Sequence, residues 1–290
     1  MRPSLSLAER EREYSPSSCI GGNYAPYLKA YAERSAAAAA CRFERDLAYG
    51  ERPSNRLDLC VPAGAQAAPL LVFIHGGYWQ QLSKDSSLFA APDCLAAGWA
   101  FAAIDYTLAP VATIAQMALE CRQALRWLHA SADRLGFDAR RIVVAGSSAG
   151  AHLAAMAGLR GWAGDADLPA GLPAAAVLVS GIYELAPLIG TSIDTPLALT
   201  SASAGEVSPQ LQSLAGFPPA VVCWGEIETA QFQRQSRDFA AAVAGAGAPR
   251  PRLFEVPGRN HFDVILELAT PGTPLGDATH ALMHQESTTP

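Results

Sequence analysis

The feature that most constrains the fold of this chain is an alternation between short apolar runs and longer stretches with helical periodicity. Most of the apolar runs lack the polar alternation expected of a strand that has one face in water. Strands of this kind are buried on both faces, and intervening helices connect them in parallel. We therefore predict an α/β fold with a mostly parallel central sheet and helices on both faces. The predicted strands are residues 69–74, 99–105, 141–145, 174–180, 219–224 and 252–256, and the predicted helices are 88–98, 114–135, 150–158 and 231–244.

The other segments are arranged around this core. Residues 42–48 and 56–61 alternate well enough to predict two more strands joined by a turn. Residues 1–40, Ala-rich in their second half, are expected to form a helical segment near the active site. The stretch 186–217 is rich in Pro, Ser, Thr and Gly, which indicates an excursion from the sheet that serves as a lid or pocket wall. With half of its residues hydrophobic, the chain is expected to form a single domain over residues 1–290.

Charge and cysteine content limit the classes of partner. The formal net charge is -6 and no Lys/Arg cluster is present, which argues against nucleic acid and against anionic membranes. No apolar run reaches the ~18–20 residues needed to span a bilayer. The N-terminus does not resemble a secretory signal, and the six cysteines are scattered without a CxxC pair. We expect a reduced cytoplasmic protein with a small-molecule substrate and no metal or other cofactor; the oligomeric state, monomer or homodimer, is left open.

A nucleophile is predicted where the strand 141–145 runs into GSSAG and then into a helix. This is the G-x-S-x-G pattern in its strand–turn–helix context, in which the tight turn leaves no room for side chains flanking the serine. The turn lifts Ser148 Oγ above the sheet edge, at the N-terminus of a helix that favours developing negative charge. Ser147 fails the flanking-glycine register, so Ser148 is the candidate nucleophile.

A nucleophilic serine needs a base, and the base needs an acid that orients it. In enzymes that carry the nucleophile in a G-x-S-x-G turn of this kind, the chain order is Ser, acid, His. His261 follows the strand 252–256 and is the candidate base. Glu226 and Glu228 compete for the role of the acid in the loop after 219–224. We favour Glu228, because the loop rather than the strand end must turn the carboxylate toward the histidine.

Other polar residues near these motifs are assigned elsewhere. Asp263 is too close to His261 in sequence to be its partner. His152 lies one helical turn past Ser148, and packing beneath the turn is its expected role.

The sequence HGGYW, residues 75–79, follows an early buried strand, where this class places donors for the tetrahedral oxyanion. Gly76 and Gly77 fit that role together with the amide of Ala149, and His75 is expected to brace the loop. Tyr78 and Trp79 are candidate substrate-binding residues for an aromatic or flat apolar group. The alternative, that these two rings pack against the N-terminal helix, stays open at this stage.

With these motifs identified, the chain resembles the arylformamidases of the α/β-hydrolase fold, the serine-hydrolase type of kynurenine formamidase. The resemblance runs over most of the chain. Its segments are EREYSPS (11–17), HGGYWQ (75–80), GSSAGAHLAAM (146–156), LVSGIYEL (178–185), SPQL (208–211), FQRQS (232–236) and NHFD (260–263).

The resemblance implies hydrolysis of an N-formyl aryl amide, such as N-formylkynurenine, with Ser148, Glu228 and His261 as the triad. It also implies an oxyanion hole formed by Gly76, Gly77 and Ala149. The chain departs from the family at two positions. Glu228 stands where Asp is usual, and Ser147 stands where His is frequent, which affects the identity of the substrate more than the chemistry.

Three rival interpretations remain. A carboxylesterase of the hormone-sensitive-lipase-like group shares the HGG and G-x-S-A-G elements and the segment DYTLAP, 105–110. A metal-dependent formamidase would need closely spaced His and Asp ligands, and the sequence shows no such cluster. A non-catalytic binding protein would not need a serine, an acid and a histidine in this order.

Overall fold

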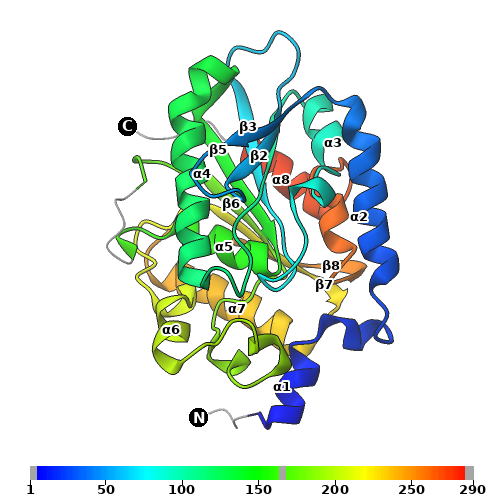
Figure 1. Cartoon of the computed structure of the whole chain (residues 1–290), viewed down its shortest axis with the longest axis vertical. Coiled ribbons are helices and arrows are strands. Elements are labelled where there is room, and N and C mark those ends of the chain that lie inside the picture. Colours follow the sequence, from blue (N-terminus) through cyan, green and yellow to red (C-terminus); the bar gives the residue numbers. More distant parts are fainter. Residues whose placement is uncertain (1–4, 163–167, 285–290) are drawn as a thin grey trace.

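The computed structural model describes residues 5–162 and 168–284, and an eight-stranded sheet runs through it (Figure 1). The strand order is β1-β2-β4-β3-β5-β6-β7-β8; β2 is antiparallel to both of its neighbours, and the other pairs are parallel. The predicted α/β fold with a mostly parallel sheet is thereby confirmed. The strands are β1 (Phe43–Ala48), β2 (Arg56–Cys60), β3 (Ala68–Ile74), β4 (Ala100–Ile104), β5 (Phe137–Ser147), β6 (Ala175–Val179), β7 (Ala220–Ile227) and β8 (Arg252–Asn260).

Helices cover both faces of the sheet, as predicted. α4, α5 and α7 pack on one face, and α2, α3 and α8 on the other, so that two hydrophobic clusters sandwich the strands (Figure 1). α1 and α6 lie at the end of the molecule where the parallel strands finish (Figure 1). The α-helices are α1 (Leu7–Glu13), α2 (Ala25–Ala37), α3 (Ala91–Ala96), α4 (Ile114–Leu135), α5 (Ala149–Gly158), α6 (Ser201–Glu206), α7 (Ala230–Gly245) and α8 (Pro274–Met283).

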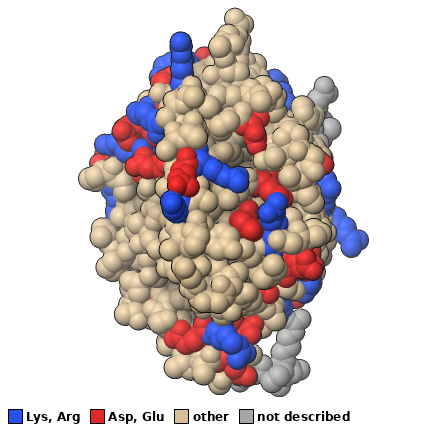
Figure 2. All heavy atoms as spheres, turned by 90° about the vertical axis from the view of Figure 1, so that its right-hand side faces the viewer, with Lys and Arg blue, Asp and Glu red and all other residues tan. Residues whose placement is uncertain are grey.

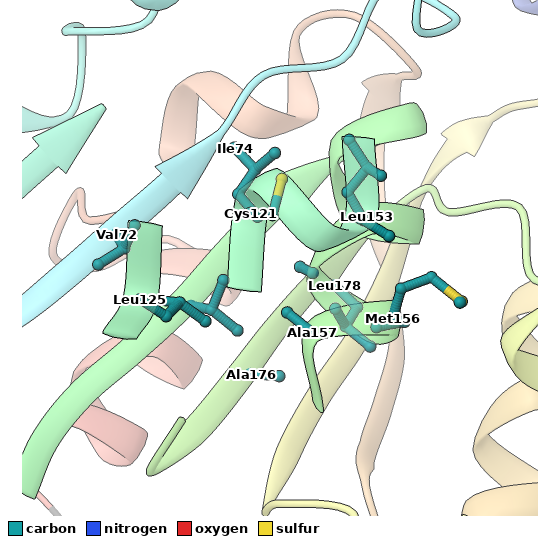
Figure 3. Close-up of a cluster of buried hydrophobic side chains, with 14 of the residues drawn as sticks. Val72, Ile74, Cys121, Leu125, Leu153, Met156, Ala157, Ala176 and Leu178 are labelled. Carbon is teal, nitrogen blue, oxygen red and sulfur yellow. The ribbon is translucent and has the colours of Figure 1, made fainter. Parts of the chain in front are cut away.

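Strand β3 shows why the runs are apolar throughout. Successive side chains point to opposite faces of a strand, so Val72 and Ile74 enter one cluster while Leu71 and Phe73 enter the other. On the first face Val72 and Ile74 belong to the cluster that includes Cys121 and Leu125 of α4 (Figure 3). Because each fully buried side chain of this size contributes about 1.5–3 kcal/mol, both faces of the strand stabilise the fold.

The bounds of α4 follow from its caps. Thr113 accepts a hydrogen bond from the amide of Gln116, whose side chain accepts in turn from the amide of Thr113, which forms a capping box. Gly136 ends the helix in the left-handed region at φ 85°, as its position in the sequence predicted. α3 is shorter than the predicted helix 88–98 and starts at Ala91, with Pro92 in the first turn, where its missing N–H is tolerated.

The excursion 186–217 consists of short helical turns around α6. The 3-10 turns Ala186–Leu188 and Ser192–Asp194 precede α6, and Pro209–Leu211 follows it. Arg10 and Glu11 of α1 hydrogen-bond to residues 187–192, so the N-terminal segment and the excursion lie against each other.

Surface charges are mixed on the face that α2 forms. Figure 2 shows Lys and Arg side chains interspersed with Asp and Glu there, separated by broad areas of uncharged residues. Within the described ranges, no helix combines the length and the apolar character needed to cross a membrane. All six cysteines are free thiols, four of them buried.

Candidate active site

Ser148 lies between β5 and α5, in the turn that the GSSAG motif predicted. It is the N-cap of α5 and has φ 57° and ψ −120°, a backbone conformation that costs a non-glycine residue on the order of 1–3 kcal/mol. The Ser148 amide donates to Val179 O at 2.9 Å, which ties the turn to the end of β6. Backbone strain of this kind is characteristic of a nucleophile elbow.

Close approach of the backbone explains both glycines of the motif. A Cβ atom on Gly146 would lie 2.3 Å from the backbone of Gly150, and one on Gly150 would lie 2.0 Å from Ile74 O. Contacts this short cannot be relieved, because the opposing atoms belong to the backbone. α5 can therefore start directly over the ends of β3 and β5 only if both positions are glycine.

The loops after β7 and β8 bring Glu228 and His261 together. His261 Nδ1 lies 2.9 Å from Glu228 Oε2, and both side chains are buried. Glu228 Oε1 accepts two further hydrogen bonds at 2.6 Å, from the Ser180 hydroxyl and from the Gly225 amide. A carboxylate held by three donors fixes the imidazole orientation with its proton on Nδ1, which leaves Nε2 available as a base.

Ser148 and His261 line the same pocket, which has a volume of about 290 Å³. In the described part of the chain no hydrogen bond joins Ser148 Oγ to His261. Contacts of this kind are often long in a free enzyme and shorten when substrate binds. The roles of Ser148, Glu228 and His261 in catalysis therefore stay predictions, and the geometry is consistent with them.

The two alternative acids lie elsewhere. Glu226 is exposed, and its carboxylate accepts from the Gly258 amide at 2.7 Å. Asp263 accepts from the Asn260 amide at 2.7 Å and caps the turn after β8. Neither carboxylate reaches His261, so the structure favours the same acid as the sequence did.

The HGG loop after β3 lies directly against the elbow. A Cβ atom on Gly76 would lie 2.8 Å from Ser147 O and 3.4 Å from Ser148 Cβ, and Gly77 has φ 92°. Among the described residues no acceptor is found for the amides of Gly76 and Gly77. Ala149 is the first residue of α5, so its amide lacks an intrahelical acceptor. These three amides are therefore available as donors, as an oxyanion hole requires.

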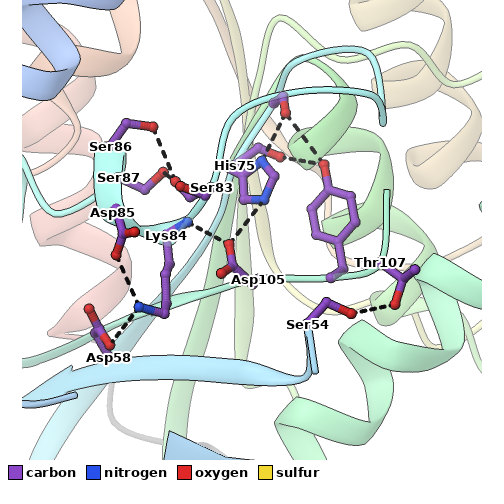
Figure 4. Close-up of polar contacts among 12 residues, drawn as sticks. Ser54, Asp58, His75, Ser83, Lys84, Asp85, Ser86, Ser87, Asp105 and Thr107 are labelled. Atoms are coloured by element: carbon purple, nitrogen blue, oxygen red, sulfur yellow. Dashed lines mark hydrogen bonds and ion pairs between the residues drawn. The ribbon is translucent and has the colours of Figure 1, made fainter. Parts of the chain in front are cut away.

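His75 braces this loop through its Nδ1 atom and its ring face (Figure 4). Nδ1 donates to Gly76 O at 2.9 Å, and Nε2 lies 3.6 Å from Asp105 Oδ1. The ring stacks on Tyr106, whose hydroxyl donates to His75 O at 3.0 Å. Burial lowers the pKa of His75 to about 4 and raises the pKa of Asp105 to about 6. His75 is therefore neutral at pH 7 and holds the loop without adding charge beside it.

Tyr78 and Trp79 turn out to have different environments. Tyr78 lines the pocket, and its hydroxyl donates to Tyr14 O. The expectation that Trp79 contacts substrate is corrected, because its side chain is fully buried in the core and does not line the pocket. Trp79 Nε1 donates to His152 Nδ1 at 3.3 Å, and His152 Nε2 donates to Val207 O at 2.6 Å. His152 thus packs beneath the elbow, as predicted, and burial lowers its pKa to about 4.

The backbone conformation at Tyr78 and Trp79 directs the two rings to different places. Tyr78 has φ 50° and Trp79 has φ 60°, values that side chains of this size rarely adopt. Burial of the Trp79 ring and the Tyr78 hydrogen bond offset that strain. With this backbone conformation the Trp79 ring lies in the core and the Tyr78 ring lines the pocket.

Comparison with known proteins assigns the family. Residues 57–169 match the BD-FAE family model. Kynurenine formamidases from Salmo salar and Danio rerio are each 30% identical to this chain, over 91% of it and 92% of the relative. The chain belongs to the kynurenine formamidase family. It is a hydrolase of the α/β type, and the resemblance noted in the sequence is confirmed.

Esterases are also among the proteins that are similar to this chain. Esterase LipC from Mycobacterium tuberculosis is 30% identical over 82% of the chain and 63% of that protein. A crystal structure of a candidate thioesterase from Silicibacter sp. TM1040 superposes with a TM-score of 0.81 at 29% identity, covering 94% of this chain and 99% of that one. An esterase from Pyrobaculum calidifontis, at 20% identity, covers 89% and 90% with a TM-score of 0.68 and shares the fold.

The N-terminal segment 1–40 was expected near the active site and the excursion 186–217 as a lid or pocket wall, and residues of both line the pocket. The individual residues of this wall, other than as part of a family segment, were not predicted. We call it the roof and define it by the pocket-lining residues of the N-terminal segment and the excursion. The signals were present, since EREYSPS belongs to the resemblance, and tyrosines at 24, 27 and 31 share one face of a helix. The roof residues are Glu11, Tyr14, Ser15, Pro16, Ser17, Tyr24, Leu28, Tyr31, Ser192 and Ile193.

Across the described residues, no group of three or more His, Cys, Asp or Glu side chains is placed to hold a metal ion.

Proposed function

We propose that this enzyme hydrolyses an aryl formamide, such as N-formylkynurenine, to formate and the free arylamine. The observation that carries the proposal is the lining of the pocket that Ser148 and His261 share. Seven Phe and Tyr rings surround it: Tyr14, Tyr24, Tyr31, Phe73, Tyr78, Phe89 and Phe262. A formyl group offers almost nothing to bind, so binding energy must come from the aryl part. Ring–ring contacts supply about 0.5–1.5 kcal/mol each beyond area burial.

Acylation starts at the serine. His261 Nε2 takes the proton of Ser148 Oγ as the oxygen attacks the formyl carbon. The developing oxyanion accepts hydrogen bonds from the amides of Gly76, Gly77 and Ala149. Glu228 keeps the imidazole oriented and stabilises its cation. His261 then gives the proton to the arylamine nitrogen, the C–N bond breaks, and a formyl-serine ester remains.

Deacylation repeats the same steps with water. His261 takes a proton from a water molecule, which attacks the formyl-enzyme, and the proton then passes to Ser148 Oγ as formate leaves. The atoms balance without a cofactor, since one water is consumed and one formate and one amine are released.

A small-ester carboxylesterase is the second candidate. The relative named esterase LipC and the esterases that share the fold favour it. The same residues would serve, with an alcohol in place of the amine. The two functions differ in the size of the acyl group that the site must admit.

Acyl preference therefore tests the proposal. We expect N-formylkynurenine to be hydrolysed with a higher kcat/KM than p-nitrophenyl acetate, and activity on p-nitrophenyl esters to fall with each added carbon. A Ser148→Ala variant serves as the blank. An optimum at butyrate or longer, with no formamide hydrolysis, would leave the esterase as the function. A cytoplasmic location and the absence of nucleic-acid and membrane partners stay predictions.

A further inference from the structure

The charged side chains that line the pocket are of one sign. Within the described ranges, Glu11 is the only Asp, Glu, Lys or Arg side chain that lines it. Its two carboxylate oxygens accept from the amide and the hydroxyl of Ser192, at 2.6 and 2.7 Å. Both bonds hold the carboxylate at the mouth of the pocket, where it is partly exposed. Histidines 75 and 261 are the other titratable residues with ring nitrogens in the lining, and both bond to fixed partners.

Two basic side chains that neighbour the pocket lining in sequence are committed to other partners. Arg10 precedes Glu11, but its guanidinium donates to the carbonyls of Pro187 and Ile189 at 2.9 and 2.5 Å. Lys84 follows the HGG loop, and its ammonium is buried against three carboxylates, of which Asp58 and Asp85 are drawn with it in Figure 4. These carboxylates are Asp46, Asp58 and Asp85, at 2.9, 3.1 and 3.0 Å. Neither cation lines the pocket.

This arrangement has an energetic consequence for charged substrates. A carboxylate that enters the pocket loses hydration, gains no cationic partner and approaches another carboxylate. An ammonium group at the same place loses hydration too, but it gains the Glu11 carboxylate. A neutral ring gains the aromatic lining and neither loses nor gains charge interactions.

We propose that the pocket selects the leaving group by charge, favouring cationic or neutral aromatic amines and alcohols over those that carry a carboxylate. Glu11 is the specificity-determining residue. The inference rests on the proposed function in one respect, that the leaving group occupies the roof side of the pocket. In N-formylkynurenine, which carries both an ammonium and a carboxylate, the ammonium is the group that Glu11 contacts. An aryl formamide with the amine and without the carboxylate is the better substrate.

The experiment compares matched leaving groups. Three phenyl acetates that carry a neutral ethyl, an aminoethyl or a carboxyethyl group at the same ring position are assayed with the full chain. The decarboxylated analogue of N-formylkynurenine is assayed beside N-formylkynurenine itself. We expect kcat/KM for the aminoethyl ester to exceed that for the carboxyethyl ester about tenfold at low salt, and the difference to shrink at high salt, because the site is partly exposed.

Two variants assign the effect. Glu11→Gln removes the charge, while its side-chain amide can still bond to Ser192, and the cation-to-anion ratio should fall about threefold or more. Glu33→Gln removes an exposed charge from α2 that pairs with Lys29 at 3.6 Å and does not line the pocket, so the ratio should stay at its original value.

Three outcomes would overturn the inference. They are equal or faster hydrolysis of the carboxyethyl ester, a ratio that Glu11→Gln leaves unchanged, and a complete lack of reaction in both series. Failure of the proposed function looks different. If the esters react and obey the charge order while both formamides are inert, the formamidase proposal is lost and the charge selection stands.

Discussion

The pocket has two walls that are built in different ways. The floor consists of Ser148, His261 and the HGG loop, with Glu228 bonded to His261 behind it, and each of these lies at the carboxyl end of a parallel strand. The roof consists of residues from α1, α2 and the excursion, which reach the pocket only through contacts across the fold. Sequence motifs specify the floor locally, whereas distant pairs such as Glu11 and Ser192 hold the roof in place. We therefore expect the proposed reaction to depend mainly on the floor and the proposed charge selection to depend on the roof.

Removing the nucleophile should have the largest effect and should not depend on the substrate. Ser148→Ala is expected to lower kcat on the order of 10⁴–10⁶-fold for esters and formamides alike. Ala fits the elbow sterically, so the melting temperature should stay close to that of the natural sequence. A sulfonyl fluoride probe should label Ser148; labelling of Ser147 would contradict the assigned register.

Neutralising the acid is the next largest change. Glu228→Gln should lower kcat on the order of 10²–10⁴-fold, because the His261 cation loses its support and the imidazole its fixed tautomer. Glu226→Gln provides the matched control, since that side chain is exposed and contacts Gly258 rather than His261. A larger loss for Glu226→Gln would mean that the acid is misassigned, although the floor as a whole would stand.

Substitutions of Tyr78 and Trp79 test which ring of the HGG loop acts on the substrate and which acts on stability. Tyr78→Leu should lower kcat/KM about 2–10-fold for an aryl substrate and much less for a small ester of a non-aromatic alcohol. Trp79→Leu should act on both substrates alike and lower the melting temperature, because it removes a fully buried ring from the core. Equal losses on both substrates for Tyr78→Leu, after correction for melting, would remove its role as a pocket wall.

The smallest expected effect is at a contact through which α2 supports the floor. The Tyr27 hydroxyl accepts from Asn260 Nδ2 at 3.0 Å, and its ring stacks on Phe262, next to the base. Tyr27 does not line the pocket, so it is a positioning residue.

Tyr27→Phe keeps the ring and removes this bond. We expect kcat to fall about twofold to threefold with KM unchanged, which corresponds to about 0.5 kcal/mol, the lower end of the range for one neutral hydrogen bond. The pH profile of kcat provides a second readout, which a purely structural role would not move. A loss above about tenfold would mean that α2 contributes to catalysis as strongly as a residue of the floor and would break the comparison.

The difference between the walls also explains what could be read from the sequence. The apolar runs predicted every parallel strand, and GSSAG, GEIE and NHFD placed Ser148, Glu228 and His261 at strand ends that the fold brings together. For Trp79, the sequence left the ring direction open, since it depends on a positive φ that no local pattern reveals. The sequence indicated Glu11 only as part of a family segment. Its role could not be predicted from local patterns, because its partner Ser192 lies 181 residues away.

The large sequence separation between α2 and the loop after β8, which are in contact in the folded protein, has a consequence for the nascent chain. Tyr27 and Asn260 are 233 residues apart, and Tyr31, which donates to Phe262 O, lies 231 residues from it. At about 5–20 residues per second, a ribosome adds Asn260 on the order of 10–50 s after Tyr27. Throughout that interval α2 lacks its partners in the loop after β8, although Tyr31 can already stack on Phe89, and the base has not yet been made. Activity during synthesis should therefore arise in a single late step, when the last strand joins the sheet and the loop after it docks on α2.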